Sequence, residues 1–229
     1  MATPTSVVAK TASSQPSLIT GSRAPSSIAT LSVAAEPLMT ALPYEADWSG
    51  GMAGWGGSDD WQTAKGLLVS DGTSYSERAG VIAPIELGSG DFAIDAEIRL
   101  EEYKDKGSSG GRASFRISAR VRPNGAGYGA GYCFSLGRFV PVCASSQQGE
   151  HRAVLWTNDP ARPLAFGQFR PGRAWHDYRL EVRGNRLALL IDGQVVLKAQ
   201  DNTYLQGSRV GLWSKRGKIS VRTFTVTEL

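Results

Sequence analysis

The sequence predicts an all-β domain built from packed antiparallel sheets, and three observations lead to this prediction. The chain contains 27 glycines in 229 residues, and no helical period is sustained for more than a few turns. Several segments instead alternate between apolar and polar residues, as a half-buried strand does. The dipeptides Gly184-Asn185 and Asp192-Gly193 separate such segments and tolerate the positive φ of a tight hairpin turn. A chain of this length can also bury a substantial core.

Residues 1–43 differ from the rest of the chain in composition. They are rich in Ala, Ser, Thr and Pro, contain one glycine and no aromatic residue, and show no sustained period. Such a segment cannot bury enough apolar area to offset the entropy lost when its backbone is ordered. We therefore expect a flexible tail or linker over residues 1–43 and one β-sandwich domain over residues 44–229. A short helix, an extra strand, a pro-segment or an assembly arm within the tail are the alternatives.

The first strands of the domain follow a glycine-rich loop around Trp55. A strand is expected at residues 66–70, and residues 75–85 are typical of an edge strand, because Pro84 has no N–H to donate to a neighbour. The alternation is strong at residues 91–101 and again at residues 115–122. The side chains expected to face the core are Phe92, Ile94, Ala96, Ile98 and Leu100 in the first of these strands, and Phe115, Ile117, Ala119 and Val121 in the second.

The second half of the domain contains further strands. A hairpin is expected from residues 132–136 and 139–143, a strand at residues 147–157, and a three-stranded meander over residues 175–197. Strands near residues 209–213 and 219–229 complete the domain. In the meander, the residues expected to face the core are His176, Tyr178, Leu180 and Val182.

The two cysteines of the chain fall in the expected hairpin. With a short loop, Cys133 lies opposite Cys143 on the same face, so that a disulfide between them is one possibility. A disulfide would favour an oxidising compartment, and hence an extracellular or cell-surface location. Two reduced, buried cysteines that behave as small apolar residues are the alternative.

Short motifs in the last third of the chain carry a resemblance to a known fold. Trp175 opens a strand, and Leu180-Glu181-Val182-Arg183-Gly184-Asn185, Ile191-Asp192-Gly193, Asp201 to Tyr204 and Gly207 to Leu212 follow in that order. This order resembles the concanavalin A-like jelly-roll superfamily, in particular its laminin G-like branch and the 3-keto-disaccharide hydrolase-like family. The resemblance implies a jelly-roll sandwich of two antiparallel sheets in which a strand near Tyr44 pairs with residues 221–229. It also implies a concave sheet that often binds sugars, although such a sandwich hosts many activities.

Charge and hydropathy argue against two classes of partner. The formal net charge is +4, from 25 Lys and Arg against 21 Asp and Glu, and the basic residues form no clustered stripe of the kind that nucleic acids require. No apolar run approaches the roughly 20 residues that cross a bilayer. The N-terminus also shows no basic segment followed by a continuous apolar one, as a secretory signal would.

Three strands offer a polar face where chemistry could occur. If the strands near residues 91–101, 115–122 and 175–183 share one sheet, their charged side chains stand within cross-strand reach of each other. This predicts either a groove for a carbohydrate or another polar ligand, or a solvated face whose ion pairs each contribute less than about 1 kcal/mol. The charged residues are Asp95, Glu97, Arg99, Glu101, Arg116, Arg120, Arg122, Asp177, Arg179, Glu181 and Arg183.

Sugar binding also needs aromatic rings at an exposed rim, and glycoside hydrolysis needs two carboxylates about 5 to 10 Å apart. Arg99 stands where the family 16 glycoside hydrolases would have another acid, and an Arg holds a neighbouring carboxylate ionised. Asp201 and Asn202 could contribute to a Ca²⁺ site, or could instead accept hydrogen bonds from their own turn. The ligand-binding candidates are Trp55, Trp61, Tyr128, Trp156, Arg116, Arg120 and Arg179, and the candidate catalytic carboxylates are Asp95, Glu97, Glu101, Asp177 and Glu181.

The sequence therefore leaves three hypotheses for function. The first is a recognition module without catalysis, most plausibly for carbohydrate. The second is a hydrolase of glycosides, either 3-keto-disaccharides or glucans, that uses a pair of the candidate carboxylates. The third is a structural or protein-interaction domain that self-assembles, or binds a protein partner, through the N-terminal tail as an added strand.

Overall fold

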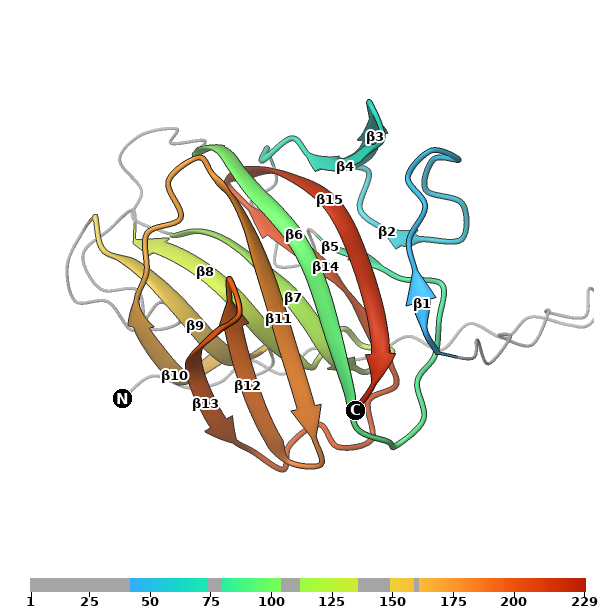
Figure 1. Cartoon of the computed structure of the whole chain (residues 1–229), viewed down its shortest axis with the longest axis vertical. Helices are drawn as coiled ribbons and strands as arrows, with labels where there is room; N and C mark the ends of the chain where they lie inside the picture. The colour runs from blue at the N-terminus through green and yellow to red at the C-terminus, as the bar shows by residue number, and fades with distance from the viewer. Residues whose placement is uncertain (1–41, 74–79, 104–111, 136–148, 159–160) are drawn as a thin grey trace, which may run out of the picture. The chain divides into compact units, whose positions relative to one another are not determined.

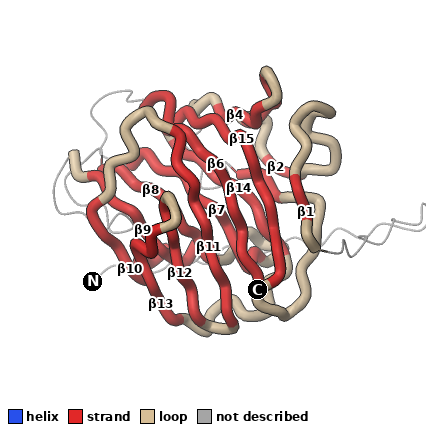
Figure 2. The backbone as a smooth tube through the Cα atoms, viewed as in Figure 1, coloured by secondary structure: helices blue, strands red, loops and turns tan. Residues whose placement is uncertain are grey.

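The computed structural model describes residues 42–73, 80–103, 112–135, 149–158 and 161–229, and the rest of the chain lies outside this description. Within these ranges the chain forms only strands, turns and loops, as Figure 2 shows, and no helix. The predicted all-β class is confirmed. None of the described residues forms a helix long and apolar enough to span a membrane.

The described strands form two antiparallel sheets that pack face to face (Figure 1). The eight-stranded sheet has the order β13-β12-β11-β6-β15-β4-β3, with β1 pairing on β15. Its strands are β1 (Tyr44–Glu45), β3 (Trp61–Ala64), β4 (Leu67–Ser70), β6 (Phe92–Tyr103), β11 (Trp175–Arg183), β12 (Arg186–Ile191), β13 (Gln194–Gln200) and β15 (Gly217–Glu228).

The seven-stranded sheet has the order β10-β9-β8-β7-β14-β5-β2. The predicted meander of β11, β12 and β13 lies in the other sheet and is confirmed, whereas β10 is a strand that the sequence analysis did not predict. The strands of the seven-stranded sheet are β2 (Gly56–Gly57), β5 (Gly80–Ile82), β7 (Arg112–Val121), β8 (Tyr128–Ser135), β9 (His151–Asn158), β10 (Ala161–Gln168) and β14 (Arg209–Lys215).

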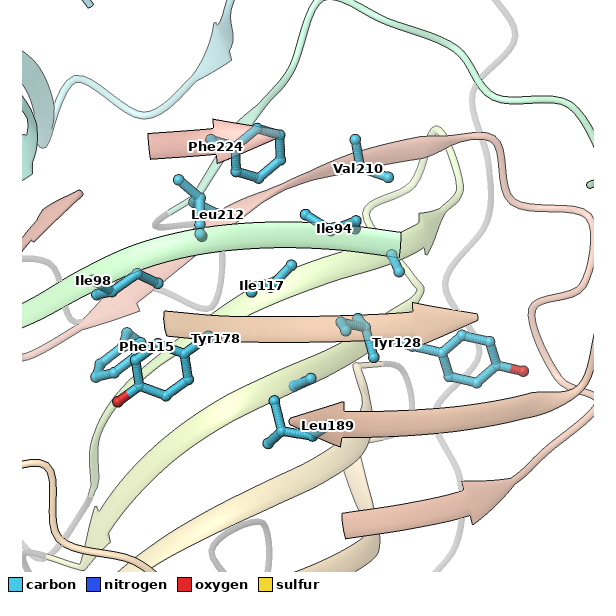
Figure 3. Packing of buried hydrophobic residues seen from close by; sticks show 14 of the residues in the cluster. Ile94, Ile98, Phe115, Ile117, Tyr128, Tyr178, Leu189, Val210, Leu212 and Phe224 are labelled. Carbon is cyan, nitrogen blue, oxygen red and sulfur yellow. The ribbon is translucent and has the colours of Figure 1, made fainter. Parts of the chain in front are cut away.

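The core lies between the two sheets and is built by the alternating strands. Ile94 and Ile98 of β6 point toward Phe115 and Ile117 of β7, as Figure 3 shows, and all four are at most 1% exposed. Every residue that the alternation places inward on β6 and β7 is buried. The pattern of apolar residues therefore predicted the interior correctly, because successive side chains of a strand point to opposite faces.

The two ends of the domain meet at one strand pair. Tyr44 of β1 pairs with Val226 of β15, and the indole N–H of Trp48 donates to the Arg222 carbonyl oxygen at 3.1 Å. The pairing that the resemblance implied between these segments is confirmed. It joins residues more than 170 positions apart in sequence and so fixes β1 at the edge of the sheet.

The expectation of one polar face shared by three strands is wrong. β6 and β11 are neighbours in the eight-stranded sheet, with Arg179 opposite Asp95, but β7 belongs to the seven-stranded sheet. Arg116 of β7 therefore lies on the outer face of the seven-stranded sheet, away from the charged residues of β6 and β11, whereas Arg120 reaches the loop before β6. The physical reason is that alternation reports which side of a strand faces the core, and two strands that face the same core from opposite sheets have the same pattern.

Two other predictions fall partly or wholly outside the described residues. Of the tail predicted at residues 1–43, residues 1–41 lie outside the described part of the chain. Of the predicted cysteine hairpin, only the first strand is described, within β8.

We expect Leu180→Ala to lower the free energy of unfolding by about 2–5 kcal/mol, because it removes a fully buried side chain and leaves a cavity. Urea denaturation at pH 7.5 measures this loss. The control is Val195→Ala on the edge strand β13, where the side chain is 52% exposed and the change should stay within about 0.5 kcal/mol. Equal losses in the two variants would contradict the placement of β11.

Candidate functional site

A cavity of about 700 Å³ opens on the outer face of the seven-stranded sheet, and we call it the β7–β14 cavity. Arg116 and Ser118 of β7 reach it, because Phe115 and Ile117 on the same strand face the core. The rim includes the exposed turn residue Asn124. The other described lining residues are Gly57, Gly80, Ile82, Val121, Pro123, Gly125, Ala126, Asn158, Leu212 and Trp213.

Arg116 lies flat on the sheet at the floor of this cavity. Its guanidinium carbon is 3.9 Å from the ring centroid of Trp213 and 5.4 Å from that of Trp156, so the cation rests against the faces of two indoles. The residue is only 5% exposed. A positive group that is held in this way against aromatic rings keeps one orientation and is preorganised to meet electron-rich oxygens.

Glycines on the neighbouring strands make room for this arrangement. A Cβ atom at Gly129 of β8 would lie 2.6 Å from Cδ of Arg116, and one at Gly80 of β5 would lie 3.0 Å from Cδ1 of Trp213. The first distance is shorter than real Cβ contacts, and the second is tighter than most of them. The sheet surface is therefore smooth where the arginine and the indole cross it.

We expect Gly129→Ala to destabilise the fold by about 1–3 kcal/mol, because the added methyl group must displace the Arg116 side chain or the Trp156 ring. Gly50→Ala is the control, since a Cβ atom there meets nothing within 4 Å and the backbone is not left-handed. Urea denaturation compares the two variants. A Gly129→Ala protein as stable as the wild type would show that Arg116 does not need this space.

Two polar atoms near the cavity have no hydrogen-bond partner within the described chain. They are the Oδ1 atom of Asn158, which lines the cavity, and the indole N–H of Trp156 beside Arg116. Buried polar atoms are nearly always paired, and an unpaired one costs roughly 1–3 kcal/mol. Asn158 thus brings an unpaired acceptor to the lining of the cavity, whereas Trp156 lies beside Arg116 and does not line the cavity.

A second cavity, of about 400 Å³, continues the first along the sheet. The two cavities share Gly57 and Ile82, and the second is also lined by Glu86 and Arg209, which form an ion pair at 3.2 Å. Together they exceed the usual volume of a pocket for one small ligand, roughly 300–1,000 Å³. The candidate site is thus an extended groove, with the Arg116 cation at the floor of one half and the Glu86–Arg209 ion pair in the wall of the other.

The predicted aromatic platforms are mostly not exposed. Trp61 is 4% exposed, and Tyr128 and Trp156 are each 1% exposed, so the expectation that these rings stand at an open rim is wrong. Trp61 and Tyr128 begin strands rather than sit in loops, and their rings enter the core. Trp55 is half-buried, packs on Trp48 with ring centroids 5.1 Å apart, and donates its N–H to the Tyr44 hydroxyl at 3.1 Å.

Arg120 is also not available as a ligand-binding group. It is 2% exposed and adopts a left-handed backbone with φ of 52°. Its guanidinium donates to the carbonyl oxygens of Gly88, Ser89 and Gly90 at distances between 2.7 and 3.1 Å. It therefore anchors the loop before β6 to the end of β7.

The candidate carboxylates and Arg179 form an ionic network on the outer face of the eight-stranded sheet. Arg179 donates to Asp95 at 2.7 Å and to Glu181 at 3.0 Å, and Arg222 pairs with Glu97. Asp177 lies opposite Glu97 in the pairing of β11 with β6. This network and the β7–β14 cavity lie on opposite faces of the sandwich.

Glu101 belongs to the same network and is held ionised. Partial burial alone would raise the pKa of its carboxyl group, but hydrogen bonds from Ser220, at 2.6 Å, and from Arg99, at 2.8 Å, keep this pKa below its ordinary value. A carboxylate with a low pKa is poorly suited to act as a general acid near neutral pH. Glu101 is therefore suited to pair with Arg99 and not to donate a proton to a substrate.

We expect the coupling between Asp95 and Arg179 to stay below about 1 kcal/mol, because both side chains are partly solvated, at 40% and 31% exposure. A double-mutant cycle with Asp95→Asn and Arg179→Gln, followed by urea denaturation, measures it. The coupling should shrink further in about 1 M salt, where charges are screened within roughly 3 Å. A value above about 2 kcal/mol, twice the usual ceiling for such pairs, would contradict this expectation and assign the network a larger structural role.

The weak metal candidates have other partners. The Asp201 carboxylate accepts hydrogen bonds from the Thr203 N–H at 2.7 Å and from Arg162 at 2.8 Å, and Asn202 accepts one from Asn185. Burial of the Tyr128 hydroxyl, which also contacts Asp201, raises its pKa to about 12. Among the described residues, no group of three or more His, Cys, Asp or Glu side chains could hold a metal ion.

Cys133 of β8 is fully buried and disulfide-bonded. It packs with Val154 and Trp156 in a small apolar cluster beside the seven-stranded sheet. The other cysteine of the chain, Cys143, lies outside the described residues.

The strand order and the face-to-face packing of two antiparallel sheets place this chain in the class of concanavalin A-like jelly-roll sandwiches. The model of the 3-keto-alpha-glucoside-1,2-lyase-like domain matches residues 46–227, and the chain belongs to this family. No protein of curated function matches the chain in sequence.

Solved structures share the fold at low sequence identity. The carbohydrate-binding module CBM66 from Bacillus subtilis has 14% identity and a TM-score of 0.49, over 76% of this chain and 91% of its own. A proposed glycosyl hydrolase from Parabacteroides distasonis has 12% identity and a TM-score of 0.50, over 77% and 89%. A GH43 protein from Bacillus licheniformis has 11% identity and a TM-score of 0.52, over 77% of this chain and 39% of its own.

Proposed function

We propose that this chain is a carbohydrate-recognition domain that binds its ligand in the β7–β14 cavity without transforming it. One observation carries the proposal: a cavity of about 700 Å³ has a preorganised guanidinium group at its floor, with hydroxyl and amide groups around it. The groups are those of Arg116, Ser118, Asn124 and Asn158.

The chemistry of the lining suits a sugar better than a purely apolar or a purely ionic ligand. Sugars present several hydroxyl groups together with apolar C–H faces, and specific pockets combine a few polar groups with a mostly apolar wall. Here Ile82 and the exposed turn residue Pro123 supply apolar surface beside the polar groups. Membership in a family described by its likeness to a lyase of 3-keto-alpha-glucosides supports a glucoside-like ligand.

The length of the groove supports a ligand of more than one sugar unit. The second cavity begins at Gly57 and Ile82, where the first one ends, and adds the Glu86–Arg209 ion pair as a polar wall. A chain of sugars that crosses this boundary would contact both halves.

The rival hypotheses have less support. A hydrolase built on Asp95, Glu97, Glu101, Asp177 and Glu181 would work on the opposite face, where four of these five carboxylates contact arginines. Assembly through the N-terminal tail concerns residues outside the described chain and stays a prediction. The disulfide at Cys133 supports our proposal of an extracellular or cell-surface location.

We expect wild-type protein to bind an oligosaccharide found by glycan array, and we expect Arg116→Met to weaken this binding at least about tenfold, or about 1.4 kcal/mol. Titration calorimetry measures the affinity. Asn158→Ala should weaken it as well, and it serves as a second variant if Arg116→Met fails to fold.

Arg222→Met is a matched control for this experiment. Arg222 also lies over an indole, 4.2 Å from the ring centroid of Trp175, but on the eight-stranded sheet. The affinity of the Arg222→Met variant for the oligosaccharide should equal that of the wild type. No binding to any glycan would refute carbohydrate recognition, equal losses in the Arg116 and Arg222 variants would refute the site, and product formation from a 3-keto-glucoside would refute a purely binding role.

A further inference from the structure

We propose that the end of β9 opposite Asn158 carries a second binding site, which takes an oxyanion group, a carboxylate or a phosphate, on a small molecule. A cavity of about 380 Å³ lies there, at the start of β9 and the end of β10. The β7–β14 cavity touches β9 only at Asn158, the last residue of the strand, so the two cavities are separated by the length of β9. The lining residues are Glu150, His151, Arg152, Gln168, Phe169 and Arg170.

Basic groups dominate this lining. Arg152 pairs with Glu150 at 3.2 Å, which leaves the positive charge of Arg170 in excess. The Nε atom of Arg152 is buried and has no hydrogen-bond partner within the described chain. Guanidinium groups bind oxyanions with several parallel hydrogen bonds, so the two arginines suit a ligand with two or three oxygens on one centre.

His151 provides a further donor, and a hydrogen bond from the core side orients its ring. Its Nδ1 atom lies 2.6 Å from the Tyr132 hydroxyl, which lies 2.5 Å from the Tyr103 hydroxyl. When Tyr103 donates to Tyr132 and Tyr132 donates to Nδ1, the proton of the neutral ring is on Nε2. The ring is fixed by stacking on Phe134, with centroids 4.6 Å apart. In this arrangement Nε2 is a donor at the cavity wall, and in the protonated ring, where Nδ1 donates to Tyr132 instead, Nε2 remains a donor.

The charges around His151 imply that anion binding takes up a proton. Burial, followed by the positive charge of Arg170, lowers the pKa of His151. Burial raises the pKa of Tyr103 and of Tyr132, so both hydroxyls stay neutral near pH 7. An anion beside Arg170 offsets its repulsion and favours the protonated ring. Since Glu150 and Arg152 compensate each other, His151 is the lining residue expected to change charge between pH 8 and pH 6.

The full-length protein is titrated with acetate and, separately, with phosphate, and binding is followed by NMR shifts of the histidine ring protons. Ionic strength is held constant with chloride. We expect millimolar affinity for at least one anion. The pH dependence is read from acetate, whose charge is constant in this range, and its affinity should strengthen several-fold from pH 8 to pH 6. The anion that binds more tightly identifies the ligand as a carboxylate or a phosphate.

Variants assign the site. Arg170→Gln should weaken binding at least fivefold, and so should His151→Asn, which keeps a partner for Tyr132 but removes Nε2. Arg173→Gln is the matched control, because Arg173 is an exposed arginine three positions away and does not line the cavity. No binding of either anion at about 10 mM, equal losses in the Arg170 and Arg173 variants, or an affinity that does not change with pH would overturn the proposal. None of these results depends on whether the β7–β14 cavity binds a sugar.

Discussion

The burial of alternate side chains of β6 is the constraint on which the rest of the structure depends. This strand of twelve residues pairs with β11 on one side and β15 on the other, so its backbone groups are satisfied within the sheet. Its apolar residues must then face the other sheet, and its charged residues must face outward. The ionic network of Asp95, Glu97 and Glu101 follows from this geometry without any selection for a ligand. This explains why the three carboxylates pair with arginines of the same sheet face.

The outer face of the seven-stranded sheet has a different character because its strands use small residues where the other sheet uses ions. Gly129 and Gly80 leave space over β8 and β5, and Arg116 and Trp213 fill this space lengthwise. Arg116, which lies over indoles on a smooth sheet, is almost fully buried. The charged side chains of the ionic network, such as Asp95 and Arg179, stay partly exposed. The eight-stranded sheet thus has a solvated outer face, and the seven-stranded sheet has a groove on its outer face.

The sequence could predict the fold because its evidence is local. Alternation at residues 91–101 and the Asp192-Gly193 turn each report on neighbouring residues, and both were correct. The assignment of β7 to the opposite sheet could not be predicted in this way, since Phe115 and Ile94 face the same core from either side. The burial of Trp156 and Arg116 depends on glycines from other strands, so no single segment could reveal it. A local signal was the run of glycines at 127, 129 and 131 beside Tyr128, which leaves room for large side chains of the neighbouring strands.

The two cavities at the ends of β9 differ in the way they obtain their polarity, and this difference follows from the sandwich. Asn158 and Arg116 reach their cavity from the face of a sheet, where each side chain is placed by its neighbours on adjacent strands. His151 instead lies at the end of the core, where hydroxyl groups from both sheets, those of Tyr103 of β6 and Tyr132 of β8, form a hydrogen-bonded chain with it. Only the end of a sandwich allows a hydrogen-bonded chain to run from the interior to the surface without crossing a sheet. A histidine in that position is coupled to the packing of both layers through Tyr103 and Tyr132.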